Sequence, residues 1–593
     1  MKNIIDRISA LREYMRGRGI AAYIVPSSDP HSSEYVADCW KSREWITGFD
    51  GSAGTAVITM DSAALWTDSR YWLAAEEVLQ GTGIALMKDG AEGTPSIASW
   101  IGDKLSAGAV VGVDGKVCSV CEVEAWSSAF AGAGLTVDAS DDAFTTVWSD
   151  RPSLPMSVAE IMPIEVAGAS ASEKISSLRG ELAAAGADAM AVTMLDEIAW
   201  LTNLRGEDVD YNPVLVSYML VTKDAAILFV APEKITSDTK EYLRNEGIAT
   251  AGYDEFFAAI SAFEGKLLLN PAKCCHAVLE AAVDCEVLRA ASPVAAMKAV
   301  KNSAEIAGFK KAMLSEGVAM VKLLNWLRSA VETENLTELS VDRKLTELRS
   351  EDENFRGLSF ATISAYGDHA AIVHYEPTPD SDKPLENHGF LLLDCGGQYS
   401  CGTTDITRTI PLGELSQEEK EDYTRVLRGH ISLAMSRFPK GTCGTQLDIL
   451  ARQWLWRAGE NYLHGTGHGV GHFLNVHEGP HQIRMNNMPA PLLPGVTVTN
   501  EPGLYKAGRF GIRIENTMLV IPSLSTEFGE YCEMEPLTLC PISKEPIVPE
   551  LLGEEAIAYL NNYHKQVYDT LAPYLQGEEL QYLKEACAAL EAV

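Results

Sequence analysis

Cysteine is scarce in this sequence, and long apolar runs are absent. Twelve cysteines among 593 residues are too few for a disulfide scaffold. Cys274 and Cys275 are adjacent, so they do not have the CxxC spacing of a redox or zinc pair. No stretch of about 18 consecutive apolar residues occurs, which argues against a membrane-spanning helix. We therefore expect a cytoplasmic protein in a reducing compartment, without a membrane segment.

Basic residues are also few in comparison with acidic ones. Forty-eight Lys and Arg stand against 82 Asp and Glu, which gives a formal net charge of -34. Such a chain repels nucleic-acid phosphates and anionic membranes unless a local basic patch intervenes, and the sequence has no such patch. The acidic residues are spread along the chain, as is typical of a solvated surface. We expect no nucleic-acid partner.

The first predicted domain, residues 1–152, has an α/β pattern. The chain length and 46% hydrophobic content predict three or more domains. Apolar residues at helical spacing predict an amphipathic first helix, and intervening charges distinguish it from a signal peptide. These residues are Ile4, Ile5, Ile8, Leu11 and Tyr14. Short β-rich runs follow at 21–26 and 55–59.

A second α/β domain is predicted over residues 153–301. It follows the proline-rich segment DRPSLPMSVAEIMPIE at 150–165, which is typical of a linker. Strand-like runs are present at 219–230 and 266–270. This domain contains no compact cluster of polar residues that would predict a site.

The third predicted domain, residues 302–593, contains most of the histidines. A long helical pattern at 304–327 leads into sequence that is rich in glycine and β formers. The domain is predicted to close with a helical extension over about residues 540–593. Candidate chemistry is concentrated between these two helical regions.

Two aspartates flank a glycine-rich turn in LLLDCGGQYSCGTTDITRTI. Asp394 ends the first predicted strand and Asp405 begins the second, so a hairpin would bring their carboxylates together. Asp beside Gly is also common in ordinary turns, so this segment alone does not identify a site.

Histidine is concentrated in YLHGTGHGVGHFLNVHEGPH, which holds five histidines in twenty residues. His464, His468 and His472 are spaced by four, as in a zinc-binding helix. Glycines alternate through the same segment, which disfavours a helix and favours an extended backbone. A mononuclear zinc hydrolase built on these three histidines is thus a weaker alternative.

Two glutamates follow. Glu501 precedes a Pro-Gly turn in VTVTNEPGLY, and Glu515 shares one face of a predicted strand with Arg513 in FGIRIENTMLV. Either glutamate alone would be expected to face solvent. Together with the two aspartates and a histidine, however, they complete an ordered set of four carboxylates and one imidazole. That set comprises Asp394, Asp405, His468, Glu501 and Glu515.

Converging carboxylates repel one another unless cations neutralise them, so the set predicts two divalent metal ions. Oxygen-rich ligation with one nitrogen favours Mn²⁺, with Zn²⁺ or Co²⁺ as alternatives. Such a pair of ions can activate water and polarise a carbonyl. A metal-dependent hydrolase is the expected class of enzyme.

The chain resembles the cytosolic Xaa-Pro aminopeptidases (aminopeptidase P) of the three-domain type, which are pita-bread metallopeptidases. The resemblance rests on DCGGQYSCGTTDITRT, HGTGHGVGHFLNVHEGP, NEPG and GIRIEN, and on FDGSAGTAVI and LWTDSRYW near the N-terminus. It implies two related α/β domains followed by a pita-bread catalytic domain. It also implies peptide substrates with proline at the second position, and it suggests a homodimer.

The same resemblance implies roles for individual residues. Asp394 would bind one metal, His468 and Glu501 the other, and Asp405 and Glu515 would bridge both. Arg513 would brace the bridging carboxylates without binding metal itself. The substrate would contact Arg70, His374 and His477, while His464 would assist proton transfer or hold the substrate.

The implied mechanism is attack of a metal-bridged hydroxide on the scissile carbonyl. His477 or His374 would help to stabilise the oxyanion, and Glu501 would relay a proton to the leaving nitrogen. A proline dipeptidase of the same fold and a non-catalytic pita-bread binding protein are the alternatives. The long N-terminal region argues against a methionine aminopeptidase.

Three further histidines are given minor roles. We expect His472, which departs from the family pattern, to be packed in the protein interior. His481 is expected in a surface loop. His369 is a weaker candidate for a substrate contact than His374.

Overall fold

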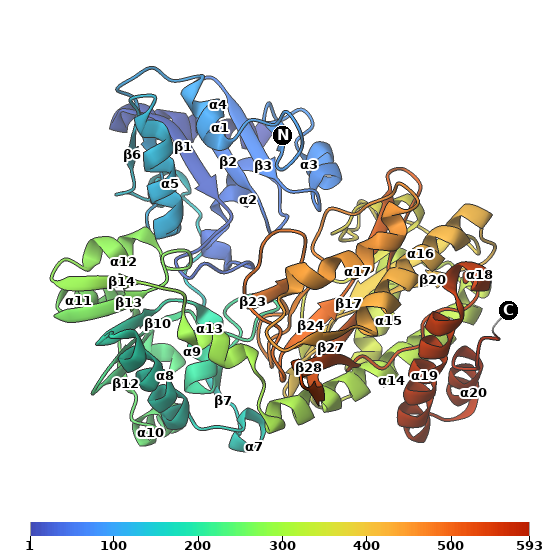
Figure 1. Ribbon diagram of the computed structural model, residues 1–593. Helices are drawn as coiled ribbons and strands as arrows, with labels where there is room; N and C mark the ends of the chain where they lie inside the picture. Colours follow the sequence, from blue (N-terminus) through green and yellow to red (C-terminus); the bar gives the residue numbers. More distant parts are fainter. Residues whose placement is uncertain (1, 592–593) are drawn as a thin grey trace. The chain divides into compact units, whose positions relative to one another are not determined.

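The computed structural model describes residues 2–591. The chain divides into two compact units, Met1–Ala295 and Ala296–Val593, which are coloured from blue to green and from green to red in Figure 1. Among the described residues no helix combines the length and apolarity needed to cross a bilayer.

The first unit begins with a six-stranded mixed sheet in the order β4-β3-β2-β1-β5-β6. Its strands are β1 (Ile20–Pro26), β2 (Thr55–Thr59), β3 (Ala63–Thr67), β4 (Ala85–Lys88), β5 (Val110–Gly112) and β6 (Thr136–Asp138). Its helices are α1 (Lys2–Arg18), α2 (Ser42–Thr47), α3 (Trp72–Val78), α4 (Ile97–Gly102), α5 (Val120–Ala131) and α6 (Phe144–Val147). The β-rich runs predicted at 21–26 and 55–59 are therefore strands.

A second sheet in the first unit has the order β12-β11-β10-β8-β13-β14. Its strands are β8 (Ala189–Val192), β10 (Ser217–Thr222), β11 (Ala226–Val230), β12 (Ala249–Ala251), β13 (Gly265–Leu269) and β14 (Cys285–Arg289). Its helices are α8 (Ala171–Ala185), α9 (Leu195–Thr202), α10 (Ser237–Asn245), α11 (Phe256–Ser261), α12 (His276–Ala281) and α13 (Pro293–Ala299). The strand-like run at 219–230 is a hairpin, because β10 and β11 pair antiparallel.

The two sheets have the same topology. In the first, β1, β2 and β3 pair antiparallel, while β4, β5 and β6 are added parallel. In the second, β8, β10 and β11 pair antiparallel, while β12, β13 and β14 are added parallel. The expectation of two related α/β folds is confirmed. Between them the segment 150–165 has little regular structure, with a short β7 (Glu160–Ile161), which pairs with β9 (Leu204–Arg205), and the start of α7 (Ile164–Ala167).

One face of α1 differs from the prediction. Ile4, Ile8 and Leu11 are buried as expected, but Ile5 is 51% exposed. Met15 is buried instead, one turn beyond Leu11. A helical stripe continues at steps of three and four residues, and Ile5 is offset from it.

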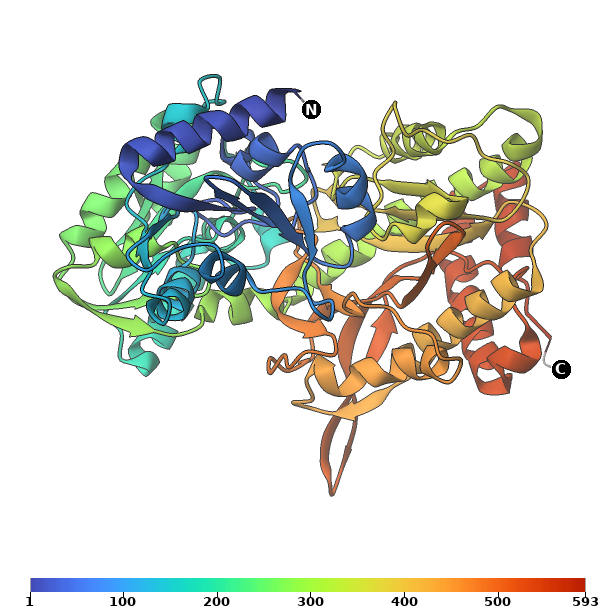
Figure 2. The same ribbon diagram turned by 90° about the horizontal axis from the view of Figure 1, so that it is seen from above.

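The second unit repeats a simple pattern, in which a pair of helices precedes a set of antiparallel strands. The helices are α14 (Ser303–Thr333), α15 (Glu338–Arg349), α16 (Gln417–Ala434) and α17 (Gly444–Trp456), followed by α18 (Pro549–Leu552), α19 (Glu554–Leu571) and α20 (Gly577–Ala586). Figures 1 and 2 show α16 and α17 on one side of the central strands and α14 on the other. This arrangement encloses the strands that carry the candidate site.

The strands after the first helix pair form two small sheets, β15-β18-β19 and β16-β17-β20. They are β15 (Phe355–Leu358), β16 (Ile363–Tyr366), β17 (Phe390–Cys395), β18 (Gly397–Tyr399), β19 (Gly402–Thr403) and β20 (Ile406–Pro411).

The strands after the second helix pair form the sheet β21-β28-β27-β24 and the hairpins β22-β23 and β25-β26. They are β21 (Arg437–Pro439), β22 (Gly467–Gly469), β23 (Glu478–Ile483), β24 (Thr497–Asn500), β25 (Gly503–Lys506), β26 (Phe510–Arg513), β27 (Asn516–Thr526) and β28 (Gly529–Pro536). The tip of the β27–β28 hairpin extends away from its unit in Figure 2.

A large apolar cluster of the second unit joins helices to strands. Val321 of α14, Phe390 of β17 and Leu427 of α16 are buried in it, together with Leu560 of α19. Burial of apolar surface at about 25 cal/mol per Å² is the main stabilising contribution of such a core. The C-terminal helices therefore stabilise the strands that hold the site.

Candidate metal centre

Asp394 and Asp405 lie on neighbouring strands. Asp394 is the penultimate residue of β17, and Asp405 directly precedes β20. The two strands pair antiparallel, with Asp394 opposite Thr407. The predicted proximity is thus correct, but the connection is more than a turn, because β18 and β19 form a second hairpin between the two aspartates.

Gly396 allows the chain between β17 and β18 to pass close to the segment that precedes β20. A Cβ atom at Gly396 would lie 2.1 Å from the carbonyl oxygen of Thr404 and 2.2 Å from the Oγ of Ser359. Only a residue without a side chain fits between these atoms. The backbone before β18 can therefore approach the residue that precedes Asp405.

The other three candidate ligands come from the second half of the unit. His468 is the central residue of β22, Glu501 follows β24, and Glu515 lies between β26 and β27. No helix forms over residues 464–472. This agrees with the prediction from the interleaved glycines and disfavours a zinc-binding helix.

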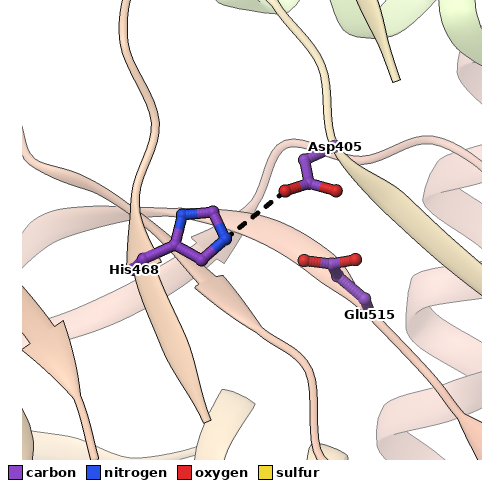
Figure 3. A group of neighbouring side chains, drawn as sticks. All are labelled: Asp405, His468 and Glu515. Carbon is purple, nitrogen blue, oxygen red and sulfur yellow. Dashed lines mark ion pairs between the residues drawn. The ribbon is translucent and has the colours of Figure 1, made fainter. Parts of the chain in front are cut away.

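The ligand atoms of Asp405, His468 and Glu515 lie within 4.8 Å of one another. Figure 3 shows the two carboxylates and the imidazole facing one another. His468 Nε2 is 3.4 Å from Asp405 Oδ2 and 3.5 Å from Glu501 Oε1. The structure thus brings together residues that are more than a hundred positions apart in the sequence.

The orientation of His468 is fixed by the backbone. Its Nδ1 lies 2.8 Å from the carbonyl oxygen of Gly469, which can only accept a hydrogen bond. Nδ1 therefore carries the proton, and Nε2 is the nitrogen that faces the carboxylates. A neutral imidazole with this tautomer presents Nε2 as a metal ligand.

The carboxylates hold protons unusually tightly in the absence of cations. Burial, together with Asp405, raises the pKa of Asp394 to about 6, although Arg513 opposes the shift. Burial raises the pKa of Glu501, and it raises that of Glu515 well above its usual value with the help of the neighbouring carboxylates. Burial alone would lower the pKa of His468, but Asp405 and Glu501 raise it to about 9.

The donor set fits divalent cations. Asp394 Oδ1 and Glu515 Oε1 are buried and have no hydrogen-bond partner among residues 2–591. Buried oxygens without a partner are costly unless a cation binds them. Two divalent ions would neutralise four carboxylates and bind these oxygens, so the residues present suit a dinuclear site.

Two threonines that the sequence reasoning missed orient the ligands. Thr407 Oγ1 donates a hydrogen bond of 2.8 Å to Glu515 Oε2. Thr499 Oγ1 donates one of 3.1 Å to Glu501 Oε1 and accepts one of 3.1 Å from the His468 backbone N–H. Thr407 and Thr499 lie two positions from Asp405 and Glu501, and this period-two spacing, which places residues on one strand face, was an available signal.

Arg513 has a different partner from the one expected. Its Nε and Nη2 donate to Asp394 Oδ2 at 3.0 and 2.6 Å, so it braces that aspartate and not the pair expected to bridge. The arginine lies at the end of β26, and β17 is close to β26 in space. The resemblance implied that Arg513 braces carboxylates, but which carboxylate lies opposite it depends on the packing of β26 against β17.

Tyr505, which the sequence reasoning also missed, links Arg513 to His464. Arg513 Nη1 donates to the Tyr505 hydroxyl at 2.7 Å, and that hydroxyl lies 2.9 Å from His464 Nε2. His464 Nδ1 lies 2.7 Å from the carbonyl oxygen of Gly465 and therefore donates to it. The hydroxyl then donates to Nε2, so His464 is oriented by a chain of hydrogen bonds that begins at Asp394.

The residues predicted to contact substrate lie in three places. His477 is next to the centre, with its ring centroid 4.3 Å from that of His468. His374 is half-buried in the loop after the 3-10 turn Gly367–Ala371. Arg70 belongs to the first unit, where it pairs with Asp68 at 2.8 Å. The substrate contacts of all three stay predictions.

The remaining histidines give one agreement and one correction. His472 is buried, and its ring lies 5.6 Å from that of Phe309, consistent with packing. His481 is also buried, on β23, and its Nε2 lies 2.8 Å from the carbonyl oxygen of Thr497. The expectation of a surface loop was wrong, because β23 continues through Gly479 and Pro480 and buries His481. His369 faces Glu338, with Nδ1 2.9 Å from Oε1.

Comparisons with known proteins cover the whole chain. The sequence model of metallopeptidase family M24 matches residues 307–522, and that of the C-terminal region of peptidase M24 matches 530–590. Two models of the creatinase/prolidase N-terminal domain match residues 7–144 and 150–305.

Individual relatives extend over nearly the full length. Aminopeptidase P1 of Arabidopsis thaliana is 39% identical, covering 98% of both chains. A probable Xaa-Pro aminopeptidase P of Laccaria bicolor is 39% identical over 99% of this chain and 94% of its own.

A crystal structure of X-prolyl aminopeptidase from Caenorhabditis elegans, described as a cytosolic enzyme with a di-nuclear active site, superposes with a TM-score of 0.95 at 32% identity over 100% of both chains. The family models, the full-length relatives and the shared architecture agree. The chain is a member of metallopeptidase family M24, in its aminopeptidase P group.

Proposed function

We propose that this protein is a dinuclear metal-dependent aminopeptidase that hydrolyses the N-terminal Xaa-Pro bond of peptides. The observation that carries the proposal is the convergence of Asp405, His468 and Glu515, with Glu501 3.5 Å from the same imidazole. Relatives with names that specify an Xaa-Pro aminopeptidase match nearly all of the chain. The five ligand types are those that a hydrolase of this group needs.

In the proposed site Asp394 would help to hold one cation, His468 and Glu501 would help to hold the second, and Asp405 and Glu515 would contribute to both. When bound, the two cations supply positive charge that acidifies water and polarises a carbonyl. The donor set of four carboxylates and one imidazole favours Mn²⁺, and Zn²⁺ or Co²⁺ are the alternatives. Asp394 is oriented for this role by the forked contact with Arg513.

The chain's own residues complete the chemistry. His477, whose ring lies against that of His468, is proposed to donate a hydrogen bond to the oxygen of the scissile carbonyl. His374 is proposed to share this function. A Glu501 oxygen is proposed to carry a proton to the leaving imino nitrogen of proline. His464, held by Tyr505 and Gly465, is proposed to hold the substrate or assist proton transfer, and Arg70 to contact the substrate.

Proline at the second position removes a backbone N–H and fixes φ, so acceptance of proline requires a site that does not depend on that donor. A homodimer and a cytoplasmic location, both expected from the resemblance or the cysteine content, remain part of the proposal.

The test compares three substrates. Metal-free protein with added Mn²⁺ is expected to release arginine from Arg-Pro-Pro, but not from Arg-Ala-Ala, and not to cleave the dipeptide Ala-Pro. The Asp405→Asn variant, which removes a proposed shared ligand, is expected to lose the activity by several orders of magnitude. Cleavage of Ala-Pro alone would instead indicate a proline dipeptidase. No cleavage with Mn²⁺, Zn²⁺ or Co²⁺ would favour a non-catalytic binding protein.

A further inference from the structure

A fully buried ion network lies next to the candidate centre. Glu478 accepts a hydrogen bond of 2.5 Å from Lys298 Nζ through Oε2, and another from Lys301 Nζ through Oε1. The three side chains are at most 3% exposed. Lys301 Nζ also donates to the carbonyl oxygen of Lys298 at 3.0 Å. Two lysines thus form ion pairs with one carboxylate in the protein interior.

Such a network is costly to bury. Moving charges out of water is compensated only when the ion pairs have good geometry, and an apolar replacement of similar size is often at least as stable. Stability alone therefore gives little reason for this arrangement, whereas positioning of the neighbouring backbone does.

Glu478 follows His477 directly and is the first residue of β23. It pairs in the sheet with Gly469, the residue after His468. A Cβ atom at Gly469 would lie 2.6 Å from the Glu478 carbonyl oxygen and 2.8 Å from the His481 ring, so the two strands are in close contact. The position of Glu478 therefore determines how His477 lies against His468.

The lysines anchor this strand to a separate part of the second unit. Lys298 and Lys301 lie near the start of the second unit, which begins at Ala296. The Lys301 backbone N–H donates to the carbonyl oxygen of Gly495 at 2.9 Å, and Val300 bridges to Val496. The segment 298–301 is thus held to the backbone just before β24, the strand that leads to Glu501.

We propose that Lys298, Lys301 and Glu478 are positioning residues that hold His477 in register with the metal centre. They act through the backbone at residue 478 and do not touch the reacting atoms. The inference rests on the proposed function, since it assumes that His477 contacts the substrate. An apolar replacement of similar size could give the same stability, so positioning of His477 is the proposed reason for the buried charges.

The test uses variants that preserve net charge. Glu478→Gln with Lys301→Met removes one negative and one positive charge, so the net charge of the protein is unchanged. We expect kcat/KM for Arg-Pro-Pro to fall about 10- to 100-fold, as is usual when residues that orient functional groups are changed. The metal content should stay at the wild-type value. Lys301→Arg, which keeps the ion pair, should recover most of the activity.

A double-mutant cycle with His477→Ala separates positioning from general damage. If the network acts through His477, adding the Glu478→Gln and Lys301→Met changes to His477→Ala should cost little more activity. If the network changes reduce kcat/KM by the same factor with and without His477→Ala, the network does not act through His477 and the proposal is overturned. As a matched control, Asp208→Asn with Lys234→Met removes another buried ion pair, in the first unit, and should leave kcat/KM unchanged.

A second readout does not depend on activity. Diethyl pyrocarbonate modification of His477, followed by mass spectrometry, should be faster in the Glu478 and Lys301 variants than in the wild type, because the imidazole is less constrained. An unchanged rate would overturn the inference. If the wild type does not cleave Arg-Pro-Pro, the proposed function fails, while this labelling rate still decides the positioning role. The single variant Lys301→Met, which keeps the ion pair between Lys298 and Glu478, serves if the double variant does not fold.

Discussion

At the scale of single residues, no member of the candidate site predicts a metal centre by itself. Asp394, two positions before Gly396, could be a turn residue, and Glu515 in a predicted strand could face solvent. In the structure both carboxylates are buried, and each has an oxygen without a hydrogen-bond partner among residues 2–591. Buried carboxylates in such a group need either protons or cations to offset their repulsion.

This competition predicts a pH dependence of metal stabilisation. The native pKa of Asp394 is raised to about 6, and that of His468 to about 9. A group with a raised native pKa stabilises the fold below its unfolded pKa and loses that contribution as pH rises through its native pKa. The metal-free protein should therefore become less stable as pH rises from about 4 to about 9, while Mn²⁺ competes better for the deprotonated ligands.

The measurement is the melting temperature with a chelator and with Mn²⁺ across this pH range. The increase caused by Mn²⁺ should grow as pH rises. A Glu515→Gln variant provides the control and should lose most of the increase. An increase that is constant, or that is largest at the acidic end, would show that the buried carboxylates and His468 do not take up the metal.

The five proposed ligands could be named because their order and spacing match a known family, and the structure brings Asp405, His468 and Glu515 together. The partner expected for Arg513 was the bridging pair, whereas the structure shows Asp394, because the partner depends on how β26 packs on β17. Tyr505 carried no signal, since an isolated tyrosine in a strand is most often a core residue.

At the scale of elements, the hairpins set the distances between ligands. Asp394 and Asp405 are separated by the β18–β19 hairpin, which requires the close backbone approach at Gly396. His468 and Glu501 are placed by strands that are linked by the Thr499 hydroxyl. Small changes in the backbone here should act on the metal centre at a distance.

Gly396→Ala tests this dependence. The added methyl would lie 2.1 Å from the carbonyl oxygen of Thr404, so β18 and the residue before Asp405 must separate. We expect metal affinity to fall about tenfold or more and the free energy of unfolding to fall by about 1–3 kcal/mol. Both are measurable, by metal analysis after dialysis and by chemical unfolding.

Gly180→Ala is the control for this change. Gly180 lies within α8 and has no atom within 4 Å of an added Cβ. Alanine should leave metal binding unchanged and should favour the helix slightly. Retention of full metal content by Gly396→Ala would mean that the hairpin tolerates the separation.

Several elements could be predicted from local patterns and others could not. TAVIT at 55–59 coincides with β2, because a short β-branched run between turn residues is a reliable strand signal. The strands β18 and β19 have three and two residues and are rich in glycine, so propensity could not distinguish them from a turn. The exposed position of Ile5 followed from the phase of the helix, which only packing determines.

At the scale of the whole molecule, two sheets of identical strand order precede the catalytic unit. No repeat is visible in the sequence of the first unit, because the topology is determined by buried positions and turns that many residues can satisfy. The resemblance to a family, and not periodicity, made the two related folds predictable. The relatives match the full length of the chain, so the N-terminal sheets belong to the proposed enzyme as much as its centre does.

The most direct test of the central claim is a titration of the metal-free protein with Mn²⁺ while the release of arginine from Arg-Pro-Pro is followed. A dinuclear site predicts that full activity requires about two equivalents of metal, that it is absent without metal, and that Asp405→Asn abolishes it. Full activity with about one equivalent, or activity without any metal, would contradict the account.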